Sequence, residues 1–134
     1  MKKTPSIPDL KSKALKLLAE VVKLRAYNEG KLICYTCDAS LNLNTSNCQL
    51  GHYLSRGAYP SLIFHPDNSR PQCYACNCHK HGHLIEFRVR LICEIGIDRV
   101  EALEAKRFDT VKWDRSYLHE LIDKYSQELK ELKS

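Results

Sequence analysis

The sequence lacks the long apolar runs, the signal peptide and the low-complexity tracts that mark membrane, secreted and disordered proteins. No apolar run approaches 18 residues, which excludes a membrane-spanning helix and a membrane partner. Its five glycines and five prolines include no low-complexity tract, so disorder is not expected outside the ends. The 134 residues are enough for one domain, spanning 1–134, with a modest core.

Seven cysteines without an export signal indicate reduced or metal-bound thiols, and therefore a cytoplasmic location. Four of them form two C-x-x-C pairs, Cys34 with Cys37 and Cys73 with Cys76. Each short turn presents two sulfurs to one side of a metal, and four thiolates at about 2.3 Å suit tetrahedral Zn²⁺. We predict a structural zinc ion at these residues. The alternative is a set of four unrelated buried or redox cysteines.

Positive charge is concentrated in the first two thirds of the chain. Residues 1–31 carry eight Lys/Arg against three Asp/Glu, residues 32–90 five against three, and residues 91–134 eight against ten. A basic surface suits a polyanion such as nucleic acid. A basic helix that faces only solvent explains the charge equally well, so charge alone does not identify a partner.

Apolar spacing indicates helices at both ends of the chain. Residues 9–29 carry a basic helix with an apolar stripe, capped by Asp9 and followed by Gly30. Residues 98–134 are expected to hold a short helix at 99–106 and a long amphipathic one at 115–132, capped by Asp114. The two long stripes exceed what a small zinc centre can cover. The long helices are therefore expected to pair with each other or with a second subunit.

Residues 32–95, between these helices, are expected to form the zinc-bound core of an α+β fold. Short strands are predicted at 49–54 and 61–64, followed by a turn at 67–71. A helix is predicted over 76–94, interrupted at Gly82. The zinc is expected to hold the segments on either side of the strands.

Three polar residues near the zinc-binding pairs are candidates for catalysis. His52 and Asn68 lie between the two pairs, and Asn77 directly follows the last cysteine. Phosphodiester hydrolysis needs a base for the attacking water and a cation that stabilises the leaving oxygen. An imidazole titrates near neutral pH, and an asparagine oxygen suits hard Mg²⁺ or Mn²⁺. We predict His52 as the base, Asn77 as a ligand of the catalytic metal, and Asn68 as a brace for the loop that holds His52.

Basic and aromatic residues flank these candidates. The predicted DNA contacts are Arg56, Arg70, Lys80, Arg88 and Arg90. Tyr53, Tyr59 and Tyr74 have rings that could stack on unpaired bases, although buried packing is the commoner role of tyrosine.

At these residues the chain resembles the NinG (Rap) recombination proteins of lambdoid phages. The similar segments are Val22-x-Leu24-Arg25, Cys34-x-x-Cys37, Gly51-His52-Tyr53, Phe64-x-x-x-Asn68, Gln72-Cys73-x-x-Cys76-Asn77-x-His79-Lys80-x-Gly82, Arg88-Val89-x-Leu91-Ile92-x-x-Ile95-Gly96 and Lys112-Trp113. The resemblance implies a structure-specific endonuclease of the HNH (ββα-metal) type, acting on Holliday junctions and D-loops in the host cytoplasm. The Cys-x-x-Cys-Asn arrangement is also similar to that of phage recombination endonuclease VII, a dimeric junction resolvase with zinc and a divalent metal.

Three positions depart from the pattern of these families. Gln49 stands where related proteins can carry aspartate, and Gly51 stands where many HNH nucleases place a metal-binding aspartate. His83 stands where relatives can carry asparagine, so it is a candidate ligand of the catalytic metal. An imidazole ligand shifts preference from Mg²⁺ toward Mn²⁺. One of His79, His81 and His83 is expected at that metal or at a phosphate, and the other two in solvent.

The sequence therefore predicts a zinc-stabilised, homodimeric HNH endonuclease for branched or double-stranded DNA. One alternative is a non-catalytic zinc module that binds nucleic acid or a protein through the same basic surface. The other is an HNH nickase or restriction-type nuclease that reads sequence instead of branch shape. Metal-dependent cutting of a four-way junction, compared with a matched linear duplex, separates the first reading from both.

Overall fold

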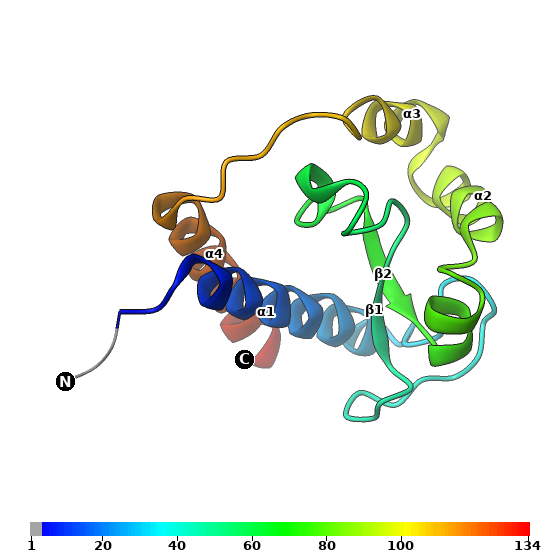
Figure 1. The fold of residues 1–134 in the computed structure, drawn as a ribbon. Helices are drawn as coiled ribbons and strands as arrows, with labels where there is room; N and C mark the ends of the chain where they lie inside the picture. Colours follow the sequence, from blue (N-terminus) through cyan, green and yellow to red (C-terminus); the bar gives the residue numbers. More distant parts are fainter. Residues whose placement is uncertain (1–3) are drawn as a thin grey trace.

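The computed structural model describes residues 4–134, which form five helical segments, two strands and one 3₁₀ turn (Figure 1). In chain order the elements are α1 (Ile7–Asn28), β1 (Gln49–His52), the 3₁₀ turn η1 (Pro60–Leu62), β2 (Ser69–Gln72), the π-helical turn η2 (Ala75–His79), α2 (Leu84–Ile95), α3 (Ile97–Ala105) and α4 (Arg115–Lys133). The predicted α+β class is confirmed. Within residues 4–134, no helix has both the length and the apolar character needed to cross a membrane.

Helix α1 begins two residues before the predicted start. Its N-cap is Ser6, whose Oγ accepts a hydrogen bond from the Asp9 backbone N–H at 3.2 Å, while Asp9 Oδ2 accepts from the Ser6 N–H at 3.3 Å. The prediction of Asp9 as the cap was therefore wrong. Asp9 is the second member of a capping box, and Pro8 fits inside the first turn, where its missing N–H costs no hydrogen bond.

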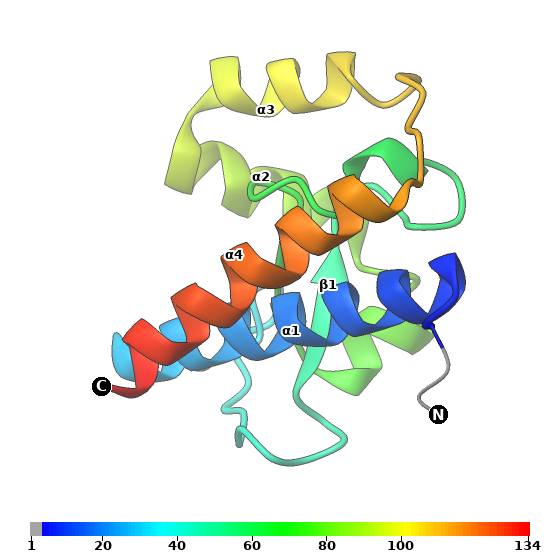
Figure 2. The ribbon, with the colours of Figure 1, turned by 90° about the vertical axis from the view of Figure 1, so that its left-hand side faces the viewer.

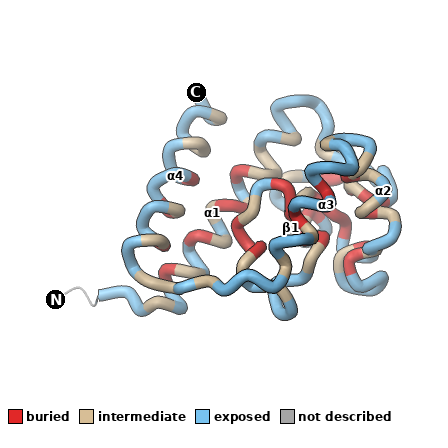
Figure 3. Tube along the Cα trace, turned by 90° about the horizontal axis from the view of Figure 1, so that it is seen from above, coloured by how far each residue is buried: buried red, intermediate tan, exposed pale blue. Residues whose placement is uncertain are grey.

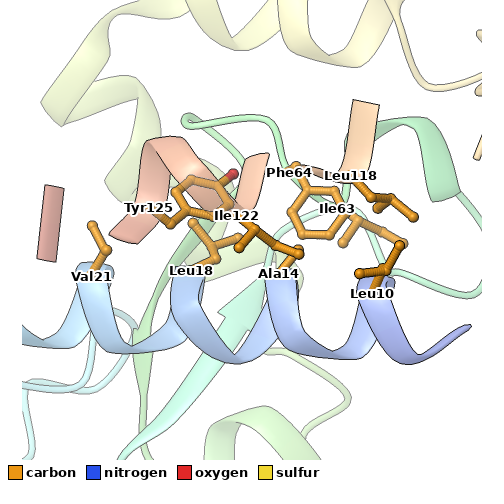
Figure 4. Close-up of a cluster of buried hydrophobic side chains, with 9 residues drawn as sticks. All are labelled: Leu10, Ala14, Leu18, Val21, Ile63, Phe64, Leu118, Ile122 and Tyr125. Atoms are coloured by element: carbon orange, nitrogen blue, oxygen red, sulfur yellow. The ribbon is translucent and has the colours of Figure 1, made fainter. Parts of the chain in front are cut away.

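The two long helices cover each other within one chain. Helix α4 begins at the predicted cap, with Asp114 Oδ1 accepting from the Tyr117 N–H at 2.8 Å, and then crosses α1 (Figure 2). The buried cluster between them contains Leu10, Ala14, Leu18, Val21, Ile63, Phe64, Leu118, Ile122 and Tyr125 (Figure 4). Of the two pairings expected from sequence, the structure contains the one within the chain.

A two-stranded antiparallel sheet lies against α1. Gln49 pairs with Gln72 and His52 with Ser69. The predicted strand at 61–64 was wrong, because Pro60 opens a 3₁₀ turn there, and the predicted turn at 67–71 contains most of β2. The reason is packing: Leu62 enters one hydrophobic cluster, whereas the next two residues, Ile63 and Phe64, both enter another, so this run does not alternate between two faces of a sheet.

The second hydrophobic cluster lies on the other side of the sheet. It contains Tyr53, Leu62, Phe87, Leu91, Val100 and Leu103, and so joins α2 and α3 to the turn after β1. The helix predicted at 76–94 is divided, as expected at Gly82, into η2 and α2. Three consecutive residues with positive φ, at 50°, 88° and 52°, make this break: His81, Gly82 and His83. Burial is concentrated where the helices face the sheet, and their outer turns are exposed (Figure 3).

Candidate functional site

The four cysteines of the two C-x-x-C pairs meet in one cluster. Their sulfur atoms all lie within 4.8 Å of one another, and Cys37 Sγ is 3.7 Å from Cys73 Sγ. Four sulfurs arranged as a tetrahedron around zinc, each about 2.3 Å from the metal, would be about 3.8 Å apart. The cluster therefore has the donors and the spacing for a structural metal such as zinc.

Backbone hydrogen bonds bring the two pairs together. The Tyr35 N–H donates to the carbonyl of Pro71 at 2.9 Å, which ties the first pair to strand β2 just before the second pair. Asp38, at a φ of 65°, closes the first turn by donating its N–H to the Cys34 carbonyl at 2.9 Å. Burial raises the pKa of the Cys76 thiol to about 12, so a metal bound there must displace a proton.

Gln72 joins the two halves of this centre from a fully buried position. Its Nε2 donates to Thr36 Oγ1 at 3.0 Å and to the carbonyl of Gly82 at 2.9 Å. The Gln72 side chain fills the space beside Gly51, where a Cβ atom would lie 1.9 Å from Gln72 Oε1. A glycine at position 51 is therefore required by packing, which accounts for the absence of an aspartate there.

We expect Gly51→Ala to lower the free energy of unfolding by about 1–3 kcal/mol, because the new methyl group overlaps a buried side chain that is held by two hydrogen bonds. Urea denaturation with zinc present measures this. Gly57→Ala is the matched control, since nothing lies within 4 Å of a Cβ at Gly57. Because the clash is with the Gln72 side chain, the two substitutions should not be additive. Gly51→Ala should lower the free energy of unfolding less in a Gln72→Ala protein than in wild type. Additive losses of unfolding free energy from the two substitutions would contradict the clash with Gln72.

His52 ends strand β1 and is buried, with 9% of its surface exposed. Its Nε2 lies 3.1 Å from the carbonyl oxygen of Ile63. A carbonyl only accepts hydrogen bonds, so Nε2 carries the proton and Nδ1 keeps its lone pair. Burial lowers the pKa of His52 to about 4, against the opposing effect of this hydrogen bond, and the positive charge of Arg56 lowers it further. The ring is therefore neutral at physiological pH, and its pKa is not near neutral as expected.

Asn68 lies fully buried immediately before strand β2. Its Oδ1 accepts from the Leu54 N–H at 2.8 Å, and its Nδ2 donates to the carbonyls of Leu54 at 2.9 Å and Leu62 at 3.0 Å. These bonds tie the residues just after His52 to the turn that carries Ile63, the residue that accepts the His52 hydrogen bond. The amide is fully used in holding the backbone on both sides of the His52 ring.

His52 and Asn77 border the same hollow in the surface, although they are 25 positions apart. Asn77 comes from η2, and its Nδ2 donates to Gln49 Oε1 at 2.8 Å. The hollow lies between α1 and β1, and a second hollow that shares His52, Arg56 and Asn77 adjoins it. The structure therefore brings together two of the three predicted catalytic residues at an open surface and places the third beneath them.

The residues lining the two hollows do not make a Mg²⁺ site by themselves. None of them is a carboxylate, and the oxygen and nitrogen donors that line the hollows with the predicted ligand Asn77 include the amide of Gln49 and the imidazole of His81. Mg²⁺ in proteins is usually held by one or two carboxylates together with substrate phosphates. The cysteine cluster suits a metal far better than this hollow does.

The predicted metal ligand His83 faces the cysteine cluster. Its Nδ1 lies 3.6 Å from Cys76 Sγ, and His83 does not line either hollow. His81, two residues earlier, lines the hollow that holds His52 and Asn77. His79 packs its ring edge-on against Tyr74, with ring centroids 5.0 Å apart. The spacing of these histidines on a regular helix could not indicate this, because positive φ values reverse the direction of the chain between them.

The five predicted DNA contacts divide into two groups. Arg70 pairs with Glu94 at 3.1 Å, Arg88 with Glu104 at 2.9 Å, and Arg90 with Asp38 at 2.7 Å. Within residues 4–134, no ion pair involves either of the other two, Arg56 and Lys80, and both are exposed. Only Arg56 lines the hollows with His52.

The three tyrosines that could stack on bases also differ in position. Tyr53 is buried and donates its hydroxyl to Glu104, and Tyr59 packs against Phe108 with ring centroids 6.0 Å apart. Tyr74 is 47% exposed. Tyr53 therefore has the buried role that is common for tyrosine, and Tyr74 is the most accessible of the three.

Two lysines at the site were not among the five residues predicted to contact DNA. Lys16 and Lys23 of α1 line the hollow with His52 and Asn77. Their positions on the polar side of α1 indicated that they face solvent or phosphate. That they share a hollow with His52 depends on how α1 packs against the sheet, which no local pattern specifies.

Comparison with known proteins finds one protein family whose members are similar to most of the chain. The family described as Bacteriophage Lambda NinG protein matches residues 3–134. The chain is 34% identical over 103 residues to Protein ninG of Escherichia phage 933W, 33% over 103 residues to that of Escherichia phage lambda and 36% over 104 residues to that of Salmonella phage P22. These alignments cover 76–77% of this chain and 48–49% of each relative, so the chain spans about half the length of the curated relatives it matches. No solved structure matches it.

Proposed function

The chain belongs to the NinG family of bacteriophage proteins, and from this membership and the geometry of the site we propose that it is a structure-specific DNA endonuclease. In this proposal it cleaves branched recombination intermediates such as Holliday junctions and D-loops in the cytoplasm of the phage's host. A homodimer is part of the proposal, since a four-way junction offers two strands to cut. The resemblance to a dimeric junction resolvase also supports a dimer, whereas the long helices do not require one, because α1 and α4 already cover each other.

We propose further that residues 32–95 form a nuclease core of the HNH (ββα-metal) type. The order of elements supports this: an antiparallel strand pair, β1 and β2, is followed by the helical turn η2. His52 ends the first strand, Asn68 precedes the second, and Asn77 lies in the helical turn after it. The cysteine cluster holds the ends of this unit together, which is a suitable role for a closed structural zinc site.

The observation that carries the proposal is the state of His52. Its Nε2–H is held by the Ile63 carbonyl, and the ring borders a hollow that Asn77 and Arg56 also line. Nδ1 is therefore free to accept a proton from a water molecule that attacks a phosphodiester. The positive charge that then forms on the ring is stabilised by the Ile63 carbonyl, which raises the basicity of the buried imidazole.

Two other residues have supporting roles in this proposal. Asn68 acts as a positioning residue, because its hydrogen bonds fix both the residues after His52 and the turn that supplies its carbonyl partner. Arg56 is exposed beside His52 and is the predicted phosphate contact that borders the site. Its charge orients the scissile phosphate and stabilises negative charge there.

A catalytic divalent cation belongs to the proposal as a group that arrives with the DNA. Such a cation supplies charge stabilisation at the phosphate. The hollow offers it an amide from Asn77 and an imidazole from His81 but no carboxylate, so most of the negative charge around it must come from the phosphates. An amide oxygen suits both Mn²⁺ and Mg²⁺, whereas an imidazole donor favours Mn²⁺, so cleavage is expected to be faster in Mn²⁺ than in Mg²⁺.

The test is an incubation of the protein with a labelled four-way junction and a matched linear duplex, in Mn²⁺, Mg²⁺ or EDTA. We expect strand cuts near the branch point in Mn²⁺, weaker cutting in Mg²⁺ and none in EDTA, with the linear duplex largely intact. Equal cutting of both DNAs would indicate a nickase or restriction-type nuclease. Binding without cutting in either metal would contradict the endonuclease proposal.

One observation favours a second candidate function, a non-catalytic zinc module that binds nucleic acid. Asn77 is hydrogen-bonded to Gln49 where related proteins can carry an aspartate, so the hollow has no carboxylate of its own. A site of this composition still attracts phosphate through Lys16, Lys23 and Arg56 without holding a metal tightly. The junction assay separates the two functions directly.

A further inference from the structure

Three hollows in the surface join into one groove along helix α1. The hollow with His52 and Asn77 shares Lys16, Ala19 and Lys23 with a neighbouring hollow that continues to Leu43 and Lys133. At its other end it shares His52, Arg56 and Asn77 with the hollow that reaches His81. The groove therefore runs from the end of α4, across α1, to the candidate site. Figure 2 shows α1 lying across β1, with the loop that precedes β1 beneath it.

The groove is basic. The charged residues that line it are Lys16, Lys23, Arg56 and Lys133 with a single acid, Glu20. Among residues 4–134, no acid forms an ion pair with Lys16 or Lys23, whereas the cations around α2 are paired with carboxylates. Within the described residues, the groove's positive charge on Lys16 and Lys23 is thus left unpaired, whereas the arginines of α2 are paired with carboxylates.

Helix geometry explains why these lysines share the groove. Ala14, Leu18 and Val21 point from α1 into the core with α4. At 100° per residue, Lys16 and Lys23 lie on nearly the opposite side of the helix and close to each other in angle. Seven residues at about 1.5 Å each separate them by about 10.5 Å along the axis, which matches about three nucleotide steps of 3.4 Å.

We infer that this groove is the path of a DNA strand to the candidate site, with Lys16 and Lys23 of α1 contacting phosphates about three nucleotide steps apart on that strand. The inference rests on the proposed function, which it deepens by placing the DNA on α1. Uncharged hydrogen-bonding side chains on the groove's other wall, Asn44, Thr45 and Ser46, suit the sugar–phosphate backbone. The arginines of α2 lie outside this path.

The test compares DNA binding by three variants in EDTA, so that no strand is cut. Lys16→Ala/Lys23→Ala should weaken binding to a four-way junction and to its matched duplex alike, and should reduce the log–log salt slope on duplex by roughly 1.8. Glu20→Gln should have the opposite effect and tighten binding, because it removes the single acid lining the groove. Lys124→Ala is the control, since Lys124 is an exposed helical lysine on α4 outside the groove and should leave both quantities unchanged.

Circular dichroism and zinc content establish that the variants are folded. An unchanged salt slope in folded Lys16→Ala/Lys23→Ala would overturn the inference. A loss of DNA affinity in Lys124→Ala equal to that in Lys16→Ala/Lys23→Ala would overturn it too. Failure of the proposed function gives a different result: wild type would bind through Lys16 and Lys23 with the expected slope but would cut no DNA in Mn²⁺ or Mg²⁺. The groove would then stand as the binding surface of a non-catalytic module.

Discussion

Replacing His52 by alanine is expected to reduce junction cleavage by roughly 10²–10⁴-fold while leaving junction affinity unchanged. General base catalysis by a positioned side chain contributes about that factor, and His52 is the side chain with a free ring nitrogen at the hollow shared with Asn77. Binding should persist because the cations of the groove and the cysteine cluster are untouched. Single-turnover cleavage in Mn²⁺ measures the rate, and binding in EDTA measures the affinity.

The pH dependence of cleavage provides a second measurement on the same residue. Because burial lowers the pKa of His52 to about 4, the ring stays neutral between pH 6 and 8, and His52 should cause no fall in rate over that range. The unfolded protein, with the ordinary pKa of about 6.5, takes up the proton first. Stability from the buried neutral ring is therefore complete above about pH 6.5 and is lost as the pH falls toward 4.

His119→Ala is the matched control, because His119 is an exposed histidine on α4. The His119→Ala protein should cleave the junction as fast as wild type. A His52→Ala protein that retains wild-type cleavage would remove His52 from the mechanism. A wild-type rate that halves near pH 6.5 would instead show that the base is a different, solvent-exposed group.

The features that could be predicted from sequence are those set by residues close together in the chain. The two C-x-x-C turns have little freedom, so their spacing alone indicated the cluster that the structure contains. Asp114 at the start of α4 was correctly predicted for the same reason. At α1 the N-cap was predicted at Asp9, three residues after the observed N-cap, Ser6. Both are good capping residues, and only the hydrogen bonds distinguish them.

Features that depend on contacts between distant segments could not be predicted. Arg70 lies 24 positions from its partner Glu94, and Arg90 lies 52 positions from Asp38, so neither pairing has a local signal. Each was predicted as a DNA contact because it is basic and close to the site in sequence. The fold instead places compensating carboxylates beside them, and this removes the positive charge that a phosphate would meet.

Burial of His52 is the most consequential feature of this kind. The sequence indicated an imidazole at the end of a strand, and an exposed imidazole would titrate near pH 6.5. The Ile63 carbonyl and the surrounding core come from segments that follow β1 by 11 positions or more, and they determine both the tautomer and the pKa. The role of Gly51 was likewise hidden, because the Gln72 side chain that fills its space comes from the opposite strand.

Replacing two of the four clustered cysteines is expected to have the largest effect on the fold. In Cys73→Ser/Cys76→Ser, the cluster loses two of its four sulfurs, and the site no longer has the donors for zinc. Structural zinc supplies on the order of 10–16 kcal/mol of apparent binding free energy to small modules. That is comparable to or larger than the whole stability of an ordinary domain, so the segment from Cys34 to His83 should unfold. Elemental analysis should find one zinc per wild-type chain and none in the variant.

The separate hydrophobic clusters predict that this unfolding is partial. The cluster between α1 and α4 contains no cysteine, and from the central segment it is reached by buried Ile63 and Phe64 and by the partly buried Leu50. Circular dichroism should therefore keep part of the helical signal, whereas hydrogen exchange should lose its protection at β1 and β2. Cys93→Ser is the control, because Cys93 is exposed on α2 and outside the cluster. A Cys73→Ser/Cys76→Ser protein with wild-type protection in both strands, or a wild-type protein without zinc, would show that the cysteines have another role. In the expected case DNA cleavage is lost with the zinc, because the strand that carries His52 and the turn that carries Asn77 are held together through this cluster.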